Sequence, residues 1–348
     1  MNRVFTSYSE EQVEFLLEKF KGHLLSVEEK EKLILSGESY YGDILSKEEY
    51  PEEEYSKIFD NVLENTKTDV AKCFIALCEK IISRRDTNKE IVLVSLARAG
   101  TPVGVVLKEV LEKKYGLSVK HYSVSAIHKY GVDSFALDYI LKNHSPETLT
   151  FIDGWVSQGR ITKTLVDTLK DKPEIDPSLY CISDPSGIQN DVATREDILL
   201  PSAILNATVS GLISRTVNNP NGFHFVASYE SQIDADRSLI FVDSIVKECL
   251  EKNFDLSSQK VLSFEKQRPL ALKQIADFCK EYNTCEKNIK VGLGEVSRSL
   301  LRRVPRIVIV NSQYKEQAEH MYWMAKQRNI MIKTVELAGP FNAFSILK

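Results

Sequence analysis

Short apolar runs alternate with amphipathic stretches through the middle of the chain. Residues 91–95, IVLVS, form a continuous apolar run of the kind found in strands that are buried on both faces. Further strands are predicted at 119–126, 149–153 and 179–184, and stretches with apolar residues at helical spacing separate them. This alternation predicts βαβ units and a mostly parallel sheet, with ligands bound at the carboxyl ends of its strands.

The regions before and after this alternation have different patterns. Apolar residues at helical spacing predict helices over 10–20 and 56–85, which we interpret as a mostly helical N-terminal arm. A further helix is expected from Ser202 to about Arg215. Two more are predicted over 238–253 and 269–283.

The tail repeats the alternation on a smaller scale. It predicts a basic helix, a strand at 306–310, an amphipathic helix and a strand at 331–335. A domain of this size can fold by itself. We therefore divide the 348 residues into an arm (1–85), an α/β domain with a cap (86–255), a connector (256–285) and a small α/β domain (286–348).

Charge is distributed unevenly along the chain. The formal net charge is −4, but residues 1–66 hold 16 acidic and 7 basic residues, whereas residues 286–348 hold 11 basic and 5 acidic. A polyanion would therefore meet the tail, although two oppositely charged solvated surfaces would give the same counts. The sequence shows no signal-peptide pattern and no apolar run of membrane-spanning length, so a soluble cytoplasmic protein with no membrane contact is expected.

The cysteines predict neither a metal site nor a disulfide framework. Six cysteines are spread along the chain without a C-x-x-C pair, and no histidine stands at zinc-ligand spacing from them. We expect reduced structural thiols in a reducing compartment. A cysteine protease needs a thiol beside a histidine base, and Cys181, which ends a predicted strand, has no activating cation among its neighbours. Thiol catalysis is therefore disfavoured.

Two loops of the α/β domain are candidate anion sites. In the first, Arg98 is followed by Ala99, Gly100 and Thr101 at the start of a predicted helix, where free amides and a guanidinium favour a phosphate. In the second, Asp153 ends a strand and the stretch to Gly159 precedes a helix; the residues proposed there are Asp153, Gly154, Ser157, Gln158 and Gly159. The alternatives are a tight turn with a solvated arginine and an aspartate that caps a turn.

Other polar residues are weaker candidates. Asn206 and Arg215 either line a pocket or are satisfied buried groups, and His128 with Lys129 either reaches a phosphate or is solvated. In the tail, a basic helix carries four arginines at a spacing that suits a phosphate backbone, although a solvated basic helix would show the same pattern. These are Arg298, Arg302, Arg303 and Arg306.

Several long blocks together resemble one bacterial family. They are SLARAGTPVGVVLK, HYSVSAI, FIDGW, TREDILLPSAILNATVSGLISRTV and VGLGEVSRSLLRRVP. The family resembles orotate phosphoribosyltransferases, carries a C-terminal pelota-type RNA-binding domain and accompanies tellurite-resistance operons. It also bears an older label, StiP-type cysteine protease. The resemblance covers nearly the whole chain from Ser36 onward.

The resemblance implies a type I phosphoribosyltransferase fold and activity. A base-like acceptor would displace pyrophosphate from magnesium-bound phosphoribosyl pyrophosphate, as part of the biosynthesis of a stress-response compound. Arg98 and Asp153 would be the catalytic residues, and Arg98, Ala99, Gly100, Thr101, His128 and Lys129 would hold pyrophosphate. Asp153 to Gly159 would hold ribose and the 5-phosphate, Asn206 and Arg215 the acceptor, and residues 286–348 RNA.

The sequence departs from the family at the second loop. Val156 and Gln158 stand where the family has threonine and lysine, so one hydroxyl and one cation are missing. The alternative is thus a degenerate transferase that serves as an RNA-binding or partner-binding module. The acceptor base, the RNA target and the formation of a homodimer are left open.

Overall fold

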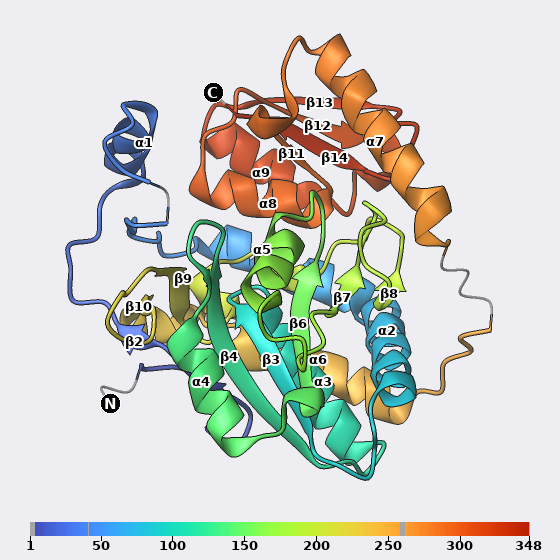
Figure 1. Cartoon of the computed structure of the whole chain (residues 1–348). Coiled ribbons are helices and arrows are strands. Elements are labelled where there is room, and N and C mark those ends of the chain that lie inside the picture. The colour runs from blue at the N-terminus through green and yellow to red at the C-terminus, as the bar shows by residue number, and fades with distance from the viewer. Residues whose placement is uncertain (1–3, 41, 258–261, 348) are drawn as a thin grey trace.

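A parallel sheet forms the centre of the body. The computed structural model describes residues 4–40, 42–257 and 262–347 (Figure 1). Within them, a seven-stranded sheet has the order β1-β4-β3-β6-β7-β8, with β5 paired to β4 and antiparallel to it. The four predicted strands are confirmed as β3 (Ile91–Ala97), β4 (Val119–Ile127), β6 (Leu149–Trp155) and β7 (Leu179–Ser183). The predicted fold class, a parallel α/β body followed by a small α/β domain, is correct.

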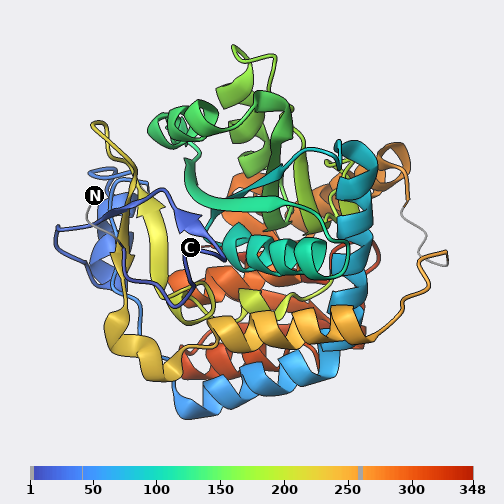
Figure 2. The same cartoon turned by 90° about the horizontal axis from the view of Figure 1, so that it is seen from below.

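Helices cover both faces of this sheet, as the continuous apolar strands require. On β3, Leu93 faces one core, and Val92 and Val94 face the other. Figures 1 and 2 show α2, α3 and α6 on one face and α4 and α5 on the other. These helices are α2 (Glu53–Arg84), α3 (Gly100–Lys113), α4 (Ser134–Asn143), α5 (Arg160–Leu169) and α6 (Ser238–Glu251).

The N-terminal arm is less helical than predicted. The helix expected over 10–20 is wrong: that segment forms β1 (Glu14–Phe15), beside β4, and β2 (Glu18–Lys19), beside β10. Its apolar residues are buried against these strands, so tertiary pairing overrides the local helical pattern. The arm also contains α1 (Val27–Leu35), which begins at a capping box formed by Ser26 and Glu29.

The helix expected from Ser202 to Arg215 is also wrong. Two single turns, Pro201–Ala203 and Ala207–Val209, lead into β9 (Ile213–Val217), which pairs with β10 (Phe225–Ser228). Gly211 has a φ of 77°, and Leu212 has a φ of 62°. A right-handed helix cannot pass through residues in this region, so the chain turns into a strand instead.

The C-terminal domain is a four-stranded sheet between helices. Its strands have the order β11-β14-β12-β13, with α8 and α9 toward the body and α7 on the opposite face (Figure 1). The predicted basic helix, two strands and amphipathic helix are confirmed, while β11 and β14 were missed. The bounds are α7 (Phe264–Glu281), β11 (Ile289–Val291), α8 (Leu293–Arg302), β12 (Ile307–Asn311), α9 (Glu319–Gln327), β13 (Met331–Val335) and β14 (Ala343–Ile346).

Several shorter elements complete the fold. They are β5 (Gly131–Val132), β8 (Val192–Thr194) and the single-turn helices Pro146–Thr148, Glu230–Ala235, Glu286–Asn288 and Ser312–Tyr314. The first residues of the predicted connector include 258–261, which lie outside the described residues, and α7 occupies most of its remainder. Within the described ranges, no helix is both long enough and apolar enough to cross a membrane.

The C-terminal domain packs over the carboxyl edge of the central sheet. Apolar residues of α8 and α9 belong to the same core cluster as α2 and α3, and the Tyr55 and Trp323 rings lie 4.9 Å apart across the interface. The Asp197 carboxylate, from the body, accepts hydrogen bonds from the backbone amides of Leu293 (2.9 Å) and Asn342 (2.7 Å). The two parts therefore share one interior, and the edge where α/β proteins bind ligands lies beneath α8.

Candidate functional site

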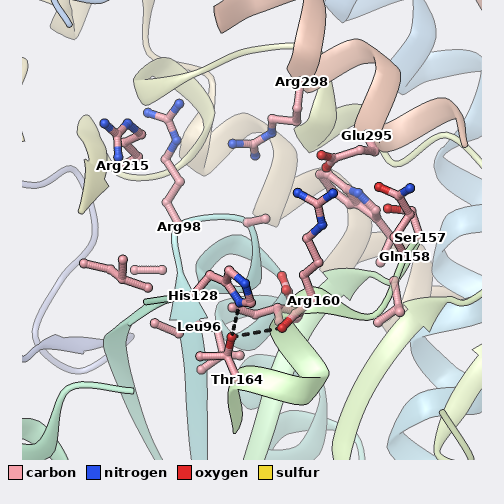
Figure 3. Close-up of a pocket in the computed structure, with 18 of the residues that line it drawn as sticks. Leu96, Arg98, His128, Ser157, Gln158, Arg160, Thr164, Arg215, Glu295 and Arg298 are labelled. Atoms are coloured by element: carbon pink, nitrogen blue, oxygen red, sulfur yellow. Dashed lines mark hydrogen bonds between the residues drawn. The ribbon is translucent and has the colours of Figure 1, made fainter. Parts of the chain in front are cut away.

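A cavity of about 360 Å³ lies between the carboxyl edge of the sheet and α8. From β3 the chain passes to β4 on one side, and then to β6 on the other side of β3. Such a reversal opens a crevice at the strand ends. The walls come from the ends of β3, β4 and β6, from Tyr40 and Gly42 of the arm, and from α8 (Figure 3). We call this cavity the interdomain pocket.

Arg98, on the body wall, makes four hydrogen bonds through its terminal nitrogens, while its Nε has no hydrogen-bond partner among the described residues. Its Nη1 donates to both Glu48 carboxylate oxygens, at 2.6 and 2.8 Å, and to the Ile213 carbonyl at 2.9 Å. Its Nη2 donates to the Asn206 side chain at 2.6 Å. Burial lowers the pKa of Arg98, and Glu48 counteracts this by raising it. Arg98 is therefore already part of a buried ion pair, and a pyrophosphate would have to compete with Glu48 for it.

Gly100 and Thr101 do not line the interdomain pocket as predicted. A Cβ on Gly100 would lie 2.4 Å from the Ile152 carbonyl oxygen, so a glycine is needed where α3 starts against β6. The Thr101 amide donates to the Arg98 carbonyl at 3.1 Å, and its hydroxyl lies 2.8 Å from that of Ser123. These two residues hold the helix against the sheet, while Ala99 remains in the pocket wall.

Arg298, on the opposite wall, is buried but poorly partnered. It is 3% exposed, and its Nη2 donates to the Ser202 carbonyl at 3.0 Å. In the described part of the chain, its Nε and Nη1 have no hydrogen-bond partner. The guanidinium lies over the Trp155 ring, 5.5 Å from the centroid, and points toward the space between Arg98 and Arg160 (Figure 3). Burial, and then Arg302 and Arg98, lower its pKa well below the usual range.

The loop after β6 forms the floor of the pocket. Ser157, Gln158 and Gly159 line it, and Gly159 has a φ of 72° immediately before α5 begins. The Gln158 side chain donates to the Glu286 carbonyl of the C-terminal domain at 3.2 Å. Gln158 thus joins the two parts of the chain. Gly154, predicted here, is buried, and its amide donates to Asp153 at 2.8 Å.

Asp153 lies at the bottom of the pocket with a perturbed acidity. Burial raises its pKa to about 7, while the Gly154 amide and the nearby Arg298 lower it. Glu295 is the second carboxylate of the wall and lies 2.9 Å from Lys290. Although burial raises the pKa of Glu295, Lys290 and then the arginines lower it below its usual range. One acid is thus partly protonated near neutrality, and the other is paired.

The lining carries a surplus of positive charge. Six cationic side chains face two carboxylates: Arg98, Arg160, Arg215, Lys290, Arg298 and Arg302 against Asp153 and Glu295. Glu48 forms an ion pair with Arg98, and Glu295 forms one with Lys290. A concave site with such a surplus attracts an anion. Among the described residues, no group of three or more His, Cys, Asp or Glu could hold a metal ion.

The remaining predicted residues are divided between the pocket and its surroundings. His128 and Arg215 line the pocket, whereas Lys129 lies outside the lining, over the Tyr40 and Tyr130 rings. Asn206 does not line it, because its side chain accepts from Arg98. Sequence reasoning missed Tyr40, Glu48 and Glu295, which reach the site only through tertiary packing.

The predicted RNA-binding arginines do not form one exposed row. Arg298 and Arg302 line the interdomain pocket, and the Arg303 Nη2 donates to Glu31 of the arm at 3.1 Å. Arg306 is exposed, beside Cys285 in a separate depression. The helical spacing of these residues was correct, but α8 turns this face toward the body.

No cysteine of the described residues lines the pocket, although Cys181 on β7 is the register partner of Asp153 on β6. Cys73, Cys78, Cys181 and Cys249 are buried, and burial raises the pKa of each. Burial also raises the pKa of Cys279, while Cys285 is exposed. No hydrogen bond joins a cysteine to a histidine within the described residues. The buried thiols therefore remain protonated at neutral pH.

Comparisons with known proteins give a family for the chain. The model of "Tellurite-like stress resistance cysteine protease StiP" matches residues 6–246, and that of "PELOTA RNA binding domain" matches residues 270–348. "Cysteine protease StiP" of Acinetobacter baylyi is 28% identical over 98% of this chain and 94% of its own. A solved hypothetical protein from Neisseria gonorrhoeae with bound ppGpp is 13% identical over 46% of this chain and 77% of its own, with a TM-score of 0.25 that supports no argument.

These findings correct the predicted activity. The phosphoribosyltransferase function is wrong, because the matching family and the relative are both described as cysteine proteases, which are hydrolases. The link to tellurite-like stress resistance and the pelota-type tail are confirmed. The chain belongs to the tellurite-like stress resistance StiP family and carries a C-terminal PELOTA RNA-binding domain match.

Proposed function

We propose that this protein binds a phosphate-bearing ligand in the interdomain pocket and RNA through its C-terminal domain. The observation that carries the first part is Arg298, a buried guanidinium with two nitrogens that lack partners. A buried unpaired charge is costly, and a bound anion would remove that cost. The PELOTA match over 270–348 supports the second part.

The geometry favours phosphate over a simple carboxylate. Arginines reach the cavity from α5, α8 and β9, and three-sided access suits a tetrahedral anion with several acceptor oxygens. Ser157 and the amides before α5 would contact the same group. Asp153, protonated in part, would donate to a ligand oxygen. Magnesium, if it takes part, would depend on ligand phosphate oxygens together with Asp153, since it rarely uses an all-protein cage.

Calorimetry of the full chain with inorganic pyrophosphate tests the pocket. Wild type is expected to bind, and Arg298→Ala to bind at least about tenfold more weakly, because a charged hydrogen bond contributes roughly 1.5–3 kcal/mol. The matched control is Lys273→Ala, which removes an exposed cation of α7 that pairs with Asp277. The proposal fails if wild type does not bind, or if both variants bind like wild type.

A second candidate is thiol-dependent hydrolysis, which the family description favours. The matched range 6–246 contains Cys73, Cys78 and Cys181, and these three thiols are buried. A hydrolase of this type would need one of them to become exposed and deprotonated. Alanine replacement of each, assayed on a casein substrate, tests this candidate. Loss of hydrolysis in one variant that still folds supports it, and unchanged hydrolysis in all three refutes it.

A further inference from the structure

The phosphate-binding wall of the interdomain pocket belongs to the RNA-binding part of the chain. Arg298 and Arg302 lie on α8, inside the range 270–348 that matches an RNA-binding domain. The opposite wall belongs to the range 6–246. A ligand in this pocket would therefore touch both parts at once.

The size of the pocket limits what can enter it. Its volume of about 360 Å³ is at the lower end of the roughly 300–1,000 Å³ typical of small-ligand pockets. This is room for one phosphorylated unit. A terminal phosphate has one ester link and carries about −1.5 to −2 charge near neutrality, so it suits a cationic pocket of this size better than an internal phosphate does.

The rim beside the pocket combines aromatic rings with a cation. The Lys129 Nζ lies 5.1 Å from the centroid of the Tyr40 ring and 4.9 Å from that of Tyr130. The two rings meet edge to face at 6.3 Å, and Tyr130 is 37% exposed. Tyr40 also lines the pocket, so this rim is continuous with it. Exposed rings beside cations form the usual platform for single-stranded nucleic acid.

We infer that the pocket and this rim together hold the phosphorylated end of a single-stranded RNA. The terminal phosphate lies against Arg298, and the next nucleotides follow the rim of Tyr40, Lys129 and Tyr130. This inference rests on the proposed function and names the class of its ligand. It also explains why the arginines of α8 face inward: they bind the terminal phosphate of the strand.

Fluorescence anisotropy of the full chain with a short, internally labelled RNA tests the inference. Four forms of one sequence are compared: linear with a 5′-phosphate, linear with a 3′-phosphate, linear without a terminal phosphate, and circular. At least one phosphorylated form is expected to bind about tenfold or more tightly than the circular form. Arg298→Ala should abolish this preference. Equal binding of all four forms, or no binding, overturns the inference.

Two lysine variants distinguish a specific contribution of the rim to RNA binding from the general attraction of RNA to surface cations. Lys129→Ala should weaken the binding of every linear form several-fold. It should also make the slope of log K against log salt concentration less steep by about 0.7 per lost phosphate contact. Lys163→Ala, on α5, removes a 70% exposed lysine that pairs with Asp167 and should change neither. Equal effects of the two changes would exclude a role of the rim in RNA binding.

If pyrophosphate binds but phosphorylated RNA has no advantage, the inference fails and the proposed function stands. If pyrophosphate also fails to bind, both fail.

Discussion

Each of the two walls of the interdomain pocket carries a buried arginine, and the two arginines differ in their partners. Arg98 and Arg298 are each 3% exposed, and burial lowers the pKa of both. Arg98 has a carboxylate, a carbonyl and an amide oxygen as acceptors, whereas Arg298 has one carbonyl. We call the body wall complete because its guanidinium has the Glu48 counter-charge, although the Nε of both arginines lacks a partner among the described residues. The wall from the C-terminal domain is incomplete, because Arg298 forms no ion pair among the described residues. Burial alone therefore does not identify a binding residue; a missing counter-charge does.

The largest effect is expected when the complete wall is broken. Glu48→Gln should lower the free energy of unfolding by about 3–5 kcal/mol, because it leaves the Arg98 charge buried without a counter-charge. Urea denaturation measures the change. The control is Glu49→Gln, since Glu49 is 76% exposed and pairs with Arg328 at 3.0 Å, so its loss should cost less than about 1 kcal/mol. Equal costs for the two neighbours would contradict the comparison.

A smaller, pH-dependent effect is expected at Asp153, between the two walls. Its folded pKa of about 7 lies above the ordinary 3.8, so the folded protein retains a proton that the unfolded chain releases. The free energy of unfolding should therefore fall as pH rises from about 4 to about 7, and stay level above that. Asp153→Asn removes the contribution of Asp153 and keeps an acceptor for the Gly154 amide, whereas Asp197, whose pKa burial also raises to about 7, contributes equally in both proteins.

Urea denaturation of wild type and Asp153→Asn across this pH range provides the measurement. The variant should match wild type near pH 4 and exceed it above pH 7 by a few kcal/mol, because one pKa unit is worth about 1.4 kcal/mol. Pyrophosphate binding should also weaken more in wild type than in the variant as the carboxylate becomes charged. A constant difference between the two proteins at every pH would show that Asp153 titrates normally.

The body strands that local patterns predicted correctly are those that are buried along almost their whole length. Strands β3, β6 and β7 are mostly apolar, so length and composition identify them, whereas β4 contains buried polar residues and was identified by its place in the alternation with helices. The failures lie where distant segments supply the partners. Residues 10–20 show helical spacing, but they pair with β4 and β10, and Gly211 stops the helix expected over 202–215. A local residue pattern does not show which distant segment a stretch will pair with.

The sequence indicated where the pocket lies better than it indicated what each of its residues does. The ends of β3 and β6 do border the pocket, as the alternation of strands and helices implied. The role of Arg98 could not be foreseen, since its partner Glu48 is 50 residues away in an irregular segment. The arginines of α8 were identified by spacing, but only packing shows that they face inward. Domain docking thus decided which cations are available to a ligand.

The smallest effect tests the incomplete wall most directly. Arg298→Met replaces an under-partnered buried charge by an apolar side chain of similar length. In ligand-free protein this should leave the free energy of unfolding unchanged or raise it by about 1 kcal/mol, because the desolvation cost disappears while one hydrogen bond and the Trp155 contact are lost. Thermal unfolding with and without pyrophosphate measures it: the ligand should raise the Tm of wild type and not that of the variant.

Arg98→Met supplies the matched counterpart on the complete wall. That change leaves Glu48 buried without its partner, so the protein should be destabilised even without ligand. Opposite signs for the two arginine-to-methionine changes would establish that one guanidinium holds the fold and the other is kept for a ligand. Equal destabilisation would mean that Arg298 is a structural residue, and its unpartnered nitrogens would then give no reason to place an anion in the pocket.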